Sequence, residues 1–137
     1  MGTSPAEDIA VYIASKGHGT LGTNIFVNKA PDGGGVPDDI ISLHEYFGEP
    51  SHHAMAPGAG AAIMEHPGIQ VRVRWRDLQA GQAKAYGVYK ELDGLKDTLN
   101  GTNYYYLYAV GPPMPIQHDE KNRVIYVANF IVSKSMS

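Results

Sequence analysis

Residues 68–76, with the sequence GIQVRVRWR, decide the fold of this chain. Apolar side chains occupy every second position, namely Ile69, Val71, Val73 and Trp75. Polar side chains occupy the positions between them, namely Gln70, Arg72, Arg74 and Arg76. A period of two places alternate side chains on opposite faces of a strand, whereas a rotation of about 100° per residue in a helix would mix the two sets. The stretch therefore predicts a β-strand with one face in a core and an arginine face turned to water or a partner.

Two helices are expected, one before this strand and one after it. Ser4 can cap the first helix, Pro5 suits its first position, and Gly17 can end it. Its apolar stripe consists of Ala6, Ile9, Ala10 and Ile13. Asp77 can cap the second helix, and Gly94 can end it. The stripe of this helix consists of Leu78, Gly81, Ala85, Val88 and Leu92, whose small members would let the helix lie close to a sheet.

Four further strands are expected, at residues 24–29, 40–47, 103–110 and 124–132. The turn-forming residues 30–39 join the first two, which we predict to form a wide hairpin. The order of elements predicts an α+β fold in a single domain over residues 1–137. We expect a mostly antiparallel sheet of four to five strands, two helices packed on one face, and one long loop between the second and third strands.

That loop, residues 48–67, carries no periodic pattern. Its breakers are Pro50, Pro57, Gly58, Gly60 and Pro67. We predict a flexible arm, because irregular segments of this length are uncommon in compact domains and are usually functional or disordered. Its small apolar residues and low charge favour an arm that orders against a neighbouring subunit or partner. A mobile loop without a role is an equally good interpretation.

The composition excludes several classes of protein. The 137 residues include no cysteine, so disulfides and thiolate metal sites are impossible. No apolar run is long enough to span a membrane, and the N-terminus lacks a signal pattern, so we expect a soluble, unexported protein. The net charge of −3 and the pI near 6 argue against a dedicated nucleic-acid binder. Nine tyrosines are typical of a protein with extensive interfaces.

No catalytic constellation is visible in the sequence. We interpret Asp119 to Arg123 as a polar loop before a strand, not as an acid/base pair. The one set of residues that resembles a metal site is His44, His52, His53 and His66. Adjacent histidines point in different directions on most backbones, so we predict no metal, no cofactor and no catalytic residue. A small metal- or ligand-binding enzyme domain that uses these histidines is the alternative.

The arginine face has two interpretations. Arg72, Arg74 and Arg76 could bind phosphate as a stripe, or they could pair with carboxylates of a neighbouring strand or subunit. The mild acidity of the whole chain favours pairing.

Several stretches of the chain, in order, resemble one known family. They are residues 21–27 (LGTNIFV) with Pro31 and Asp32, residues 39–48 (DIISLHEYFG), residues 67–74 (PGIQVRVR), and residues 119–123 (DEKNR) leading to Tyr126, Asn129 and Phe130. Together they are similar to the minor capsid or tail terminator (tail completion) proteins of tailed bacteriophages. The similarity extends from about Leu21 to Val132.

The resemblance implies a structural protein of the virion tail, assembled in the cytoplasm of the host bacterium. It implies a ring, typically of six copies, that binds the head-proximal end of the tail tube and stops tube growth. Its partners would be copies of itself, the tube protein, and a neck, connector or stopper protein. DNA would pass through the lumen without specific binding, and no membrane would be involved. A head-side neck or connector ring is the alternative within this class.

A ring closes when each subunit offers two different complementary patches. Long loops that carry tyrosine, methionine and proline could supply such patches. The candidate interface residues are Arg72, Arg74, Arg76, Met55, Met64 and Met114.

Overall fold

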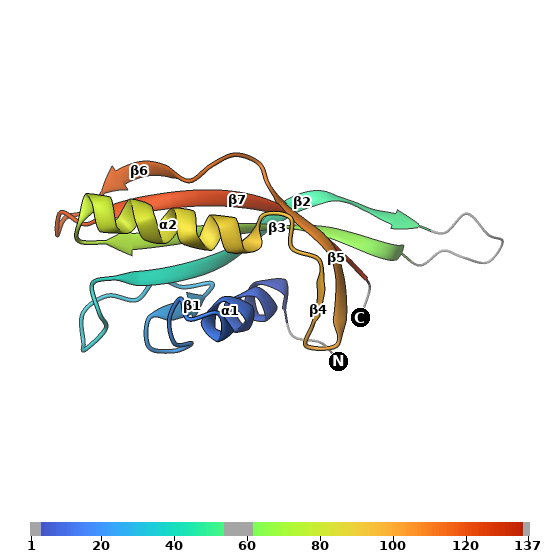
Figure 1. The fold of residues 1–137 in the computed structure, drawn as a ribbon, viewed down its shortest axis with the longest axis horizontal. Coiled ribbons are helices and arrows are strands. Elements are labelled where there is room, and N and C mark those ends of the chain that lie inside the picture. The colour runs from blue at the N-terminus through green and yellow to red at the C-terminus, as the bar shows by residue number, and fades with distance from the viewer. Residues whose placement is uncertain (1–3, 54–61, 136–137) are drawn as a thin grey trace.

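The computed structural model describes the backbone of residues 4–53 and 62–135, and the side chains of residues 4–46 and 64–135. The elements, in chain order, are α1 (Pro5–Ser15), β1 (Ile25–Val27), β2 (Ile40–His53), β3 (Ala62–Trp75), α2 (Leu78–Leu92), β4 (Asp97–Leu99), β5 (Thr102–Ala109), β6 (Met114–His118) and β7 (Val124–Ser135). The fold is α+β, as the sequence predicts, with two helices beside one curled sheet (Figure 1).

The sheet is larger than expected. Among the described residues it has seven strands in the order β1-β2-β3-β7-β5-β4, with β6 also paired to β7, so β5 and β6 share one edge of that strand. The prediction of four to five strands missed β4 and β6. β4 has three residues, and all five residues of β6 are exposed, so neither strand has an alternating pattern that would reveal it.

The stretch that decides the fold is confirmed as an inner strand. β3 lies between β2 and β7, antiparallel to both, and Val71 is opposite Leu43 on one side and Ala128 on the other. Ile69, Val71 and Val73 are buried, as their spacing predicts. The arginines project from the opposite face.

The predicted hairpin between the first two strands is wrong. β1 pairs with β2 in parallel, with Ile25 opposite Ile41. Residues 28–39 must therefore carry the chain back along the sheet before β2 begins. Turn residues indicate that a chain changes direction, but they do not show how often it does so.

The long loop between the second and third strands is shorter than predicted. Residues 48–53 belong to β2 and residues 62–67 to β3, and the two strands continue as a hairpin beyond the helices (Figure 1). The register shifts between Tyr46 and Glu49, and again between Glu49 and His52. Such irregularities move side chains between faces, which explains why the sequence shows no period here. Residues 54–61, the middle of the predicted arm, lie outside the described residues.

Both helices begin as their caps predict. The Ser4 side chain accepts a hydrogen bond from the Glu7 backbone N–H, and the Asp77 side chain accepts one from Ala80. The predicted stripe of α1 is fully buried. In α2, Leu78 is 52% exposed, although its spacing places it in the stripe. A Cβ at Gly81 would lie 2.8 Å from the Cβ of Trp75, so this glycine does allow the helix to lie close to β3.

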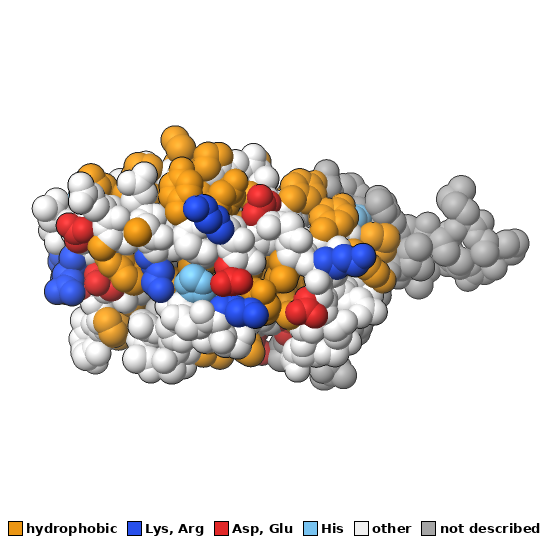
Figure 2. All heavy atoms as spheres, in the orientation of Figure 1, with side chains coloured by type: hydrophobic (Ala, Val, Ile, Leu, Met, Phe, Trp, Pro, Cys, Tyr) orange, Lys and Arg blue, Asp and Glu red, His pale blue; other side chains and the backbone are white. Residues whose placement is uncertain are grey.

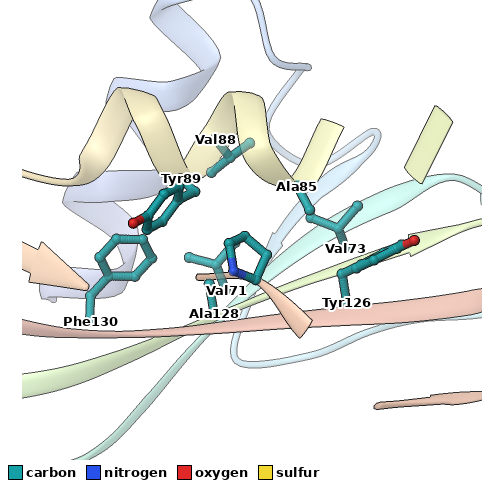
Figure 3. Close-up of a pocket in the computed structure, with 9 residues that line it drawn as sticks. Val71, Val73, Ala85, Val88, Tyr89, Tyr126, Ala128 and Phe130 are labelled. Carbon is teal, nitrogen blue, oxygen red and sulfur yellow. The ribbon is translucent and has the colours of Figure 1, made fainter. Parts of the chain in front are cut away.

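The core fills the space between the helices and one face of the sheet. Figure 3 shows Ala85 and Val88 of α2 directed at Val71 and Val73 of β3. The cavity along this seam is only about 10 Å³, hardly room for a single water molecule. The contact of α2 with the sheet is therefore tightly packed.

Candidate functional site

The face of the sheet turned away from the helices, here called the open face, carries the arginines. Its polar middle consists of Ser42, His44, Gln70, Arg72 and Asn129. The Gln70 amide donates to the Asn129 side chain at 3.0 Å, and Arg72 Nε donates to the Gln70 oxygen at 2.6 Å. The pKa of His44 is lowered by burial and then by the charge of Arg72. A neutral His44 leaves Arg72 as the charged group of this region.

At one end of the open face, Arg74 binds the backbone of residues 28–39, which connect β1 to β2. Its guanidinium donates hydrogen bonds of 3.0 Å to the backbone carbonyls of Pro31, Pro37 and Asp38. Arg74 is buried, and burial lowers its pKa. Arg74 supplies the hydrogen-bond donors for these three carbonyls, because they accept no backbone hydrogen bond among the contacts seen.

Arg123, immediately before β7, binds the same connection. Its side chain is 3% exposed, and its NH2 group lies 2.8 Å from Asp32 and 2.7 Å from Asp119, while NH1 lies 3.1 Å from Asp38. The hydrogen bond from Arg123 is the main cause of the lowered pKa of Asp32. Burial acts to raise the pKa of Asp119, but its hydrogen bonds from Arg123 outweigh burial and lower it. Residues 119–123 are thus a polar loop before a strand, as predicted, and they also hold residues 32–38 in place.

From the other end of the open face to the row of Arg72, aromatic and apolar side chains are exposed along the edge formed by β5 and β6. We call this surface the tyrosine stripe; its members are Tyr46, Tyr106, Tyr108, Val110 and Met114. Tyr106 and Tyr108, 39% and 40% exposed, stack with ring centroids 5.3 Å apart. Tyr108 is opposite Ile131 of β7, and Ile131 is opposite Gly68 of β3.

Tyr46 completes the stripe from β2. It is opposite Gly68, and a Cβ at that glycine would lie 2.6 Å from the tyrosine ring. The ring therefore covers Gly68, and its hydroxyl donates to the Phe130 carbonyl at 3.4 Å. In Figure 2, hydrophobic side chains gather along the margin where β6 and the segment before it run, whereas charges of both signs are scattered over the face in view.

One family model matches most of the chain. Residues 12–135 match the family described as "Bacteriophage tail terminator protein". The chain belongs to this family. A search of curated proteins gave no match. Membership in the tail terminator family assigns the protein a structural role in a phage tail, and it argues against the enzyme alternative.

The candidate interface residues of this tail terminator have different surroundings. Arg72 is exposed and has no carboxylate within salt-bridge distance among the described residues. Arg76 is exposed but lies 3.4 Å from Asp39 of its own chain. Arg74 is committed to the fold by its three carbonyl bonds. A role for the three arginines between subunits stays a prediction, and Arg72 is the exposed one for which no ion pair is seen among the described side chains.

The methionines also differ. Met114 is 60% exposed and lies in the tyrosine stripe. Met64 is half-buried in β3 opposite Ser135, and Met55 lies outside the described residues. The stripe as a whole was missed by sequence reasoning, although the run of tyrosines at 104–106 and Tyr108 gave a signal.

The histidines are not brought together in the described part of the chain. His44 bonds to Ser42 at 3.0 Å, His66 is buried in β3, and the side chains of His52 and His53 lie outside the described residues. Within that part, no group of three histidine, aspartate or glutamate residues could hold a metal ion. The described helices include none long and apolar enough to cross a bilayer.

Proposed function

We propose that this protein forms a ring, of six copies, that caps the head-proximal end of the tail tube. The ring ends tube polymerisation and joins the tail to the neck, connector or stopper protein. The family match supports a role in the tail, and the tyrosine stripe supports assembly through protein surfaces.

The tyrosine stripe is the observation that carries the proposal. A strand face that packs on nothing within the chain usually carries polar side chains. Here Tyr106, Tyr108, Val110 and Met114 are between 39% and 66% exposed. A contiguous exposed apolar surface of this kind is typical of a protein–protein interface, and tyrosine and methionine are enriched there.

The charge of the chain is consistent with DNA passing through the lumen. The net charge is −3, and the two buried arginines are neutralised or occupied inside the chain. A weakly acidic ring does not hold a polyanion, so DNA can slide through without specific binding. The place of assembly that follows is the cytoplasm of the host bacterium, and the place of action is the head-proximal end of the tail.

The proposal predicts tubes of defined length that are capped at one end. Purified protein is mixed with polymerising tube protein, and the products are examined by light scattering and electron microscopy. We expect a ring at one tube end and no growth from that end. Rings that bind isolated connectors but leave tubes growing would establish the head-side alternative, and a protein that remains monomeric with both partners would refute the ring.

A further inference from the structure

A second surface with apolar and acidic character lies on the helix side of the sheet. α1 and the turn after β4 enclose a groove of about 330 Å³. Its apolar lining is Val11, Tyr12 and Leu99, and its acidic lining is Glu7 and Asp8. The uncharged polar residues Ser15, Thr98 and Asn100 complete it. Val11 is 50% exposed although it belongs to a helix that is otherwise buried along its stripe. The volume is at the lower limit of the roughly 300–1,000 Å³ typical of binding pockets.

The two acidic residues of this groove have different roles. Asp8 is buried and accepts hydrogen bonds from the Tyr104 hydroxyl and the Asn100 amide, so its carboxylate belongs to the fold. Glu7 is half-buried at the rim, and no ion pair of the described residues involves it. The groove therefore presents one anion beside an apolar surface.

The tyrosine stripe has the complementary property. Arg72 is opposite Val127 of β7, and Val127 is opposite Met114 of β6, so Arg72 and Met114 lie in one row across the open face. Arg72 is therefore an exposed cation of the polar middle that lies beside the Met114 end of the stripe. The groove and the stripe lie on opposite sides of the same sheet, so they cannot meet within one chain.

We propose that the tyrosine stripe of one subunit packs into the α1 groove of the next, with Arg72 paired to Glu7 of the neighbouring copy. The inference rests on the proposed ring and states which surfaces form its contact. Two different patches on opposite sides of a subunit make a head-to-tail contact, which repeats around a ring when the rotation closes. The apolar side chains supply the buried area, and the ion pair at the rim sets the register and rejects other alignments.

A charge exchange tests the pairing. The variants are Arg72→Glu, Glu7→Arg and the double variant, and the measurement is the concentration at which half of the protein is in rings, by sedimentation velocity. Each single variant places like charges together, so we expect the half-assembly concentration to rise at least tenfold. The double variant restores opposite charges and should bring that concentration most of the way back to the wild-type value. Lys90→Glu, on the exposed side of α2, is the control and should change nothing. Thermal unfolding of each variant checks that it is folded.

A cysteine pair gives a second measurement that does not depend on charge. The chain has no cysteine, so Val11→Cys combined with Tyr108→Cys introduces the only two thiols. Mild oxidation should link them between neighbours and give a ladder of covalent multimers, whereas Lys90→Cys with Tyr108→Cys should not.

The outcomes separate the pairing from the proposed function. Wild-type protein that forms no ring, even with tubes, would overturn the proposed function. Rings that form normally in both single charge variants, or a double variant as impaired as either single one, would overturn the pairing and leave the ring intact. Ladders from the control cysteine pair alone would overturn it as well.

Discussion

The two ends of the open face differ in how the chain covers them. At one end, Arg74 and Arg123 are buried, and their donors are occupied by the carbonyls and carboxylates of residues 31–38 and Asp119. At the other end, Tyr106 and Tyr108 are left exposed on β5. Residues 31–38 therefore cover one end of the open face and leave the other end exposed.

The difference shows how to separate fold from function in a protein without a catalytic site. Side chains whose bonds are all made inside the chain stabilise the monomer. Side chains that remain apolar and exposed, or charged and unpaired, are the candidates for contacts between subunits. The arginines of β3 demonstrate this most directly, because Arg72 and Arg74 are two residues apart on one face and have opposite surroundings.

The largest effect is expected from Arg123→Met. Removing one partner of a buried ion pair costs about 3–5 kcal/mol, and the lower end applies because Asp32 and Asp38 are half-exposed and can regain water. We expect a loss of about 3 kcal/mol in the free energy of unfolding, measured with urea. Arg72→Met is the matched control and should cost less than about 0.5 kcal/mol. Equal losses in the two variants would contradict the comparison.

Acid should selectively weaken the ion pairs of Arg123 with Asp32 and Asp119. The pKa of Asp32 and that of Asp119 are lowered in the folded state, so the unfolded chain binds protons more readily. The stability that these groups contribute is fully present above their usual pKa of 3.8 and is lost as the pH falls through the lowered values. Asp8 has the opposite sign, because burial raises its pKa and its contribution falls as the pH rises above 3.8.

Subtracting the profile of Arg123→Met from that of the wild type removes the Asp8 contribution, which is common to both. We expect the difference in the free energy of unfolding to shrink between pH 5 and pH 2. A difference that stays constant over this range would show that Arg123 does not act through the carboxylates.

The smallest effect on the monomer is expected from Arg72→Gln and Arg76→Gln. Exposed pairs contribute about 0–1 kcal/mol, and Arg76 has such a pair with Asp39, whereas Arg72 pairs with no carboxylate among the described side chains. Both variants should therefore unfold close to the wild-type midpoint. Assembly should differ: Arg72→Gln should weaken rings, and Arg76→Gln should not. If only the Arg76 variant formed weaker rings, the interface would instead lie at the end of the open face that carries Arg74 and Arg123.

The local parts of the fold could be predicted from the sequence. The alternation at residues 68–76 gives β3 and its buried face, and the Ser4 and Asp77 caps give the starts of both helices. These signals depend on residues within a few positions of one another. The family resemblance also rests on such local stretches, and it is confirmed.

The parts that depend on distant residues could not be predicted. Arg123 bonds to Asp32 across 91 positions, and no pattern near either residue indicates the contact. Arg74 and Arg123 also bond to residues 31–38, which connect β1 to its parallel partner β2. Tyr46, Gly68, Ile131 and Tyr108 form one row across β2, β3, β7 and β5. The tyrosine stripe therefore depends on the order of strands in the sheet.

The position of β7 has a consequence for how the protein is made. β7 is synthesised after the other strands that the structure describes, yet it pairs with β3, β5 and β6. On the ribosome, β5 and β6 have no place in the sheet until residues 124–135 emerge. A prematurely terminated product therefore cannot display Tyr106, Tyr108 and Met114 in their proper arrangement. If the stripe makes the contact between subunits, as we propose, a fragment without residues 124–135 is not expected to join the ring.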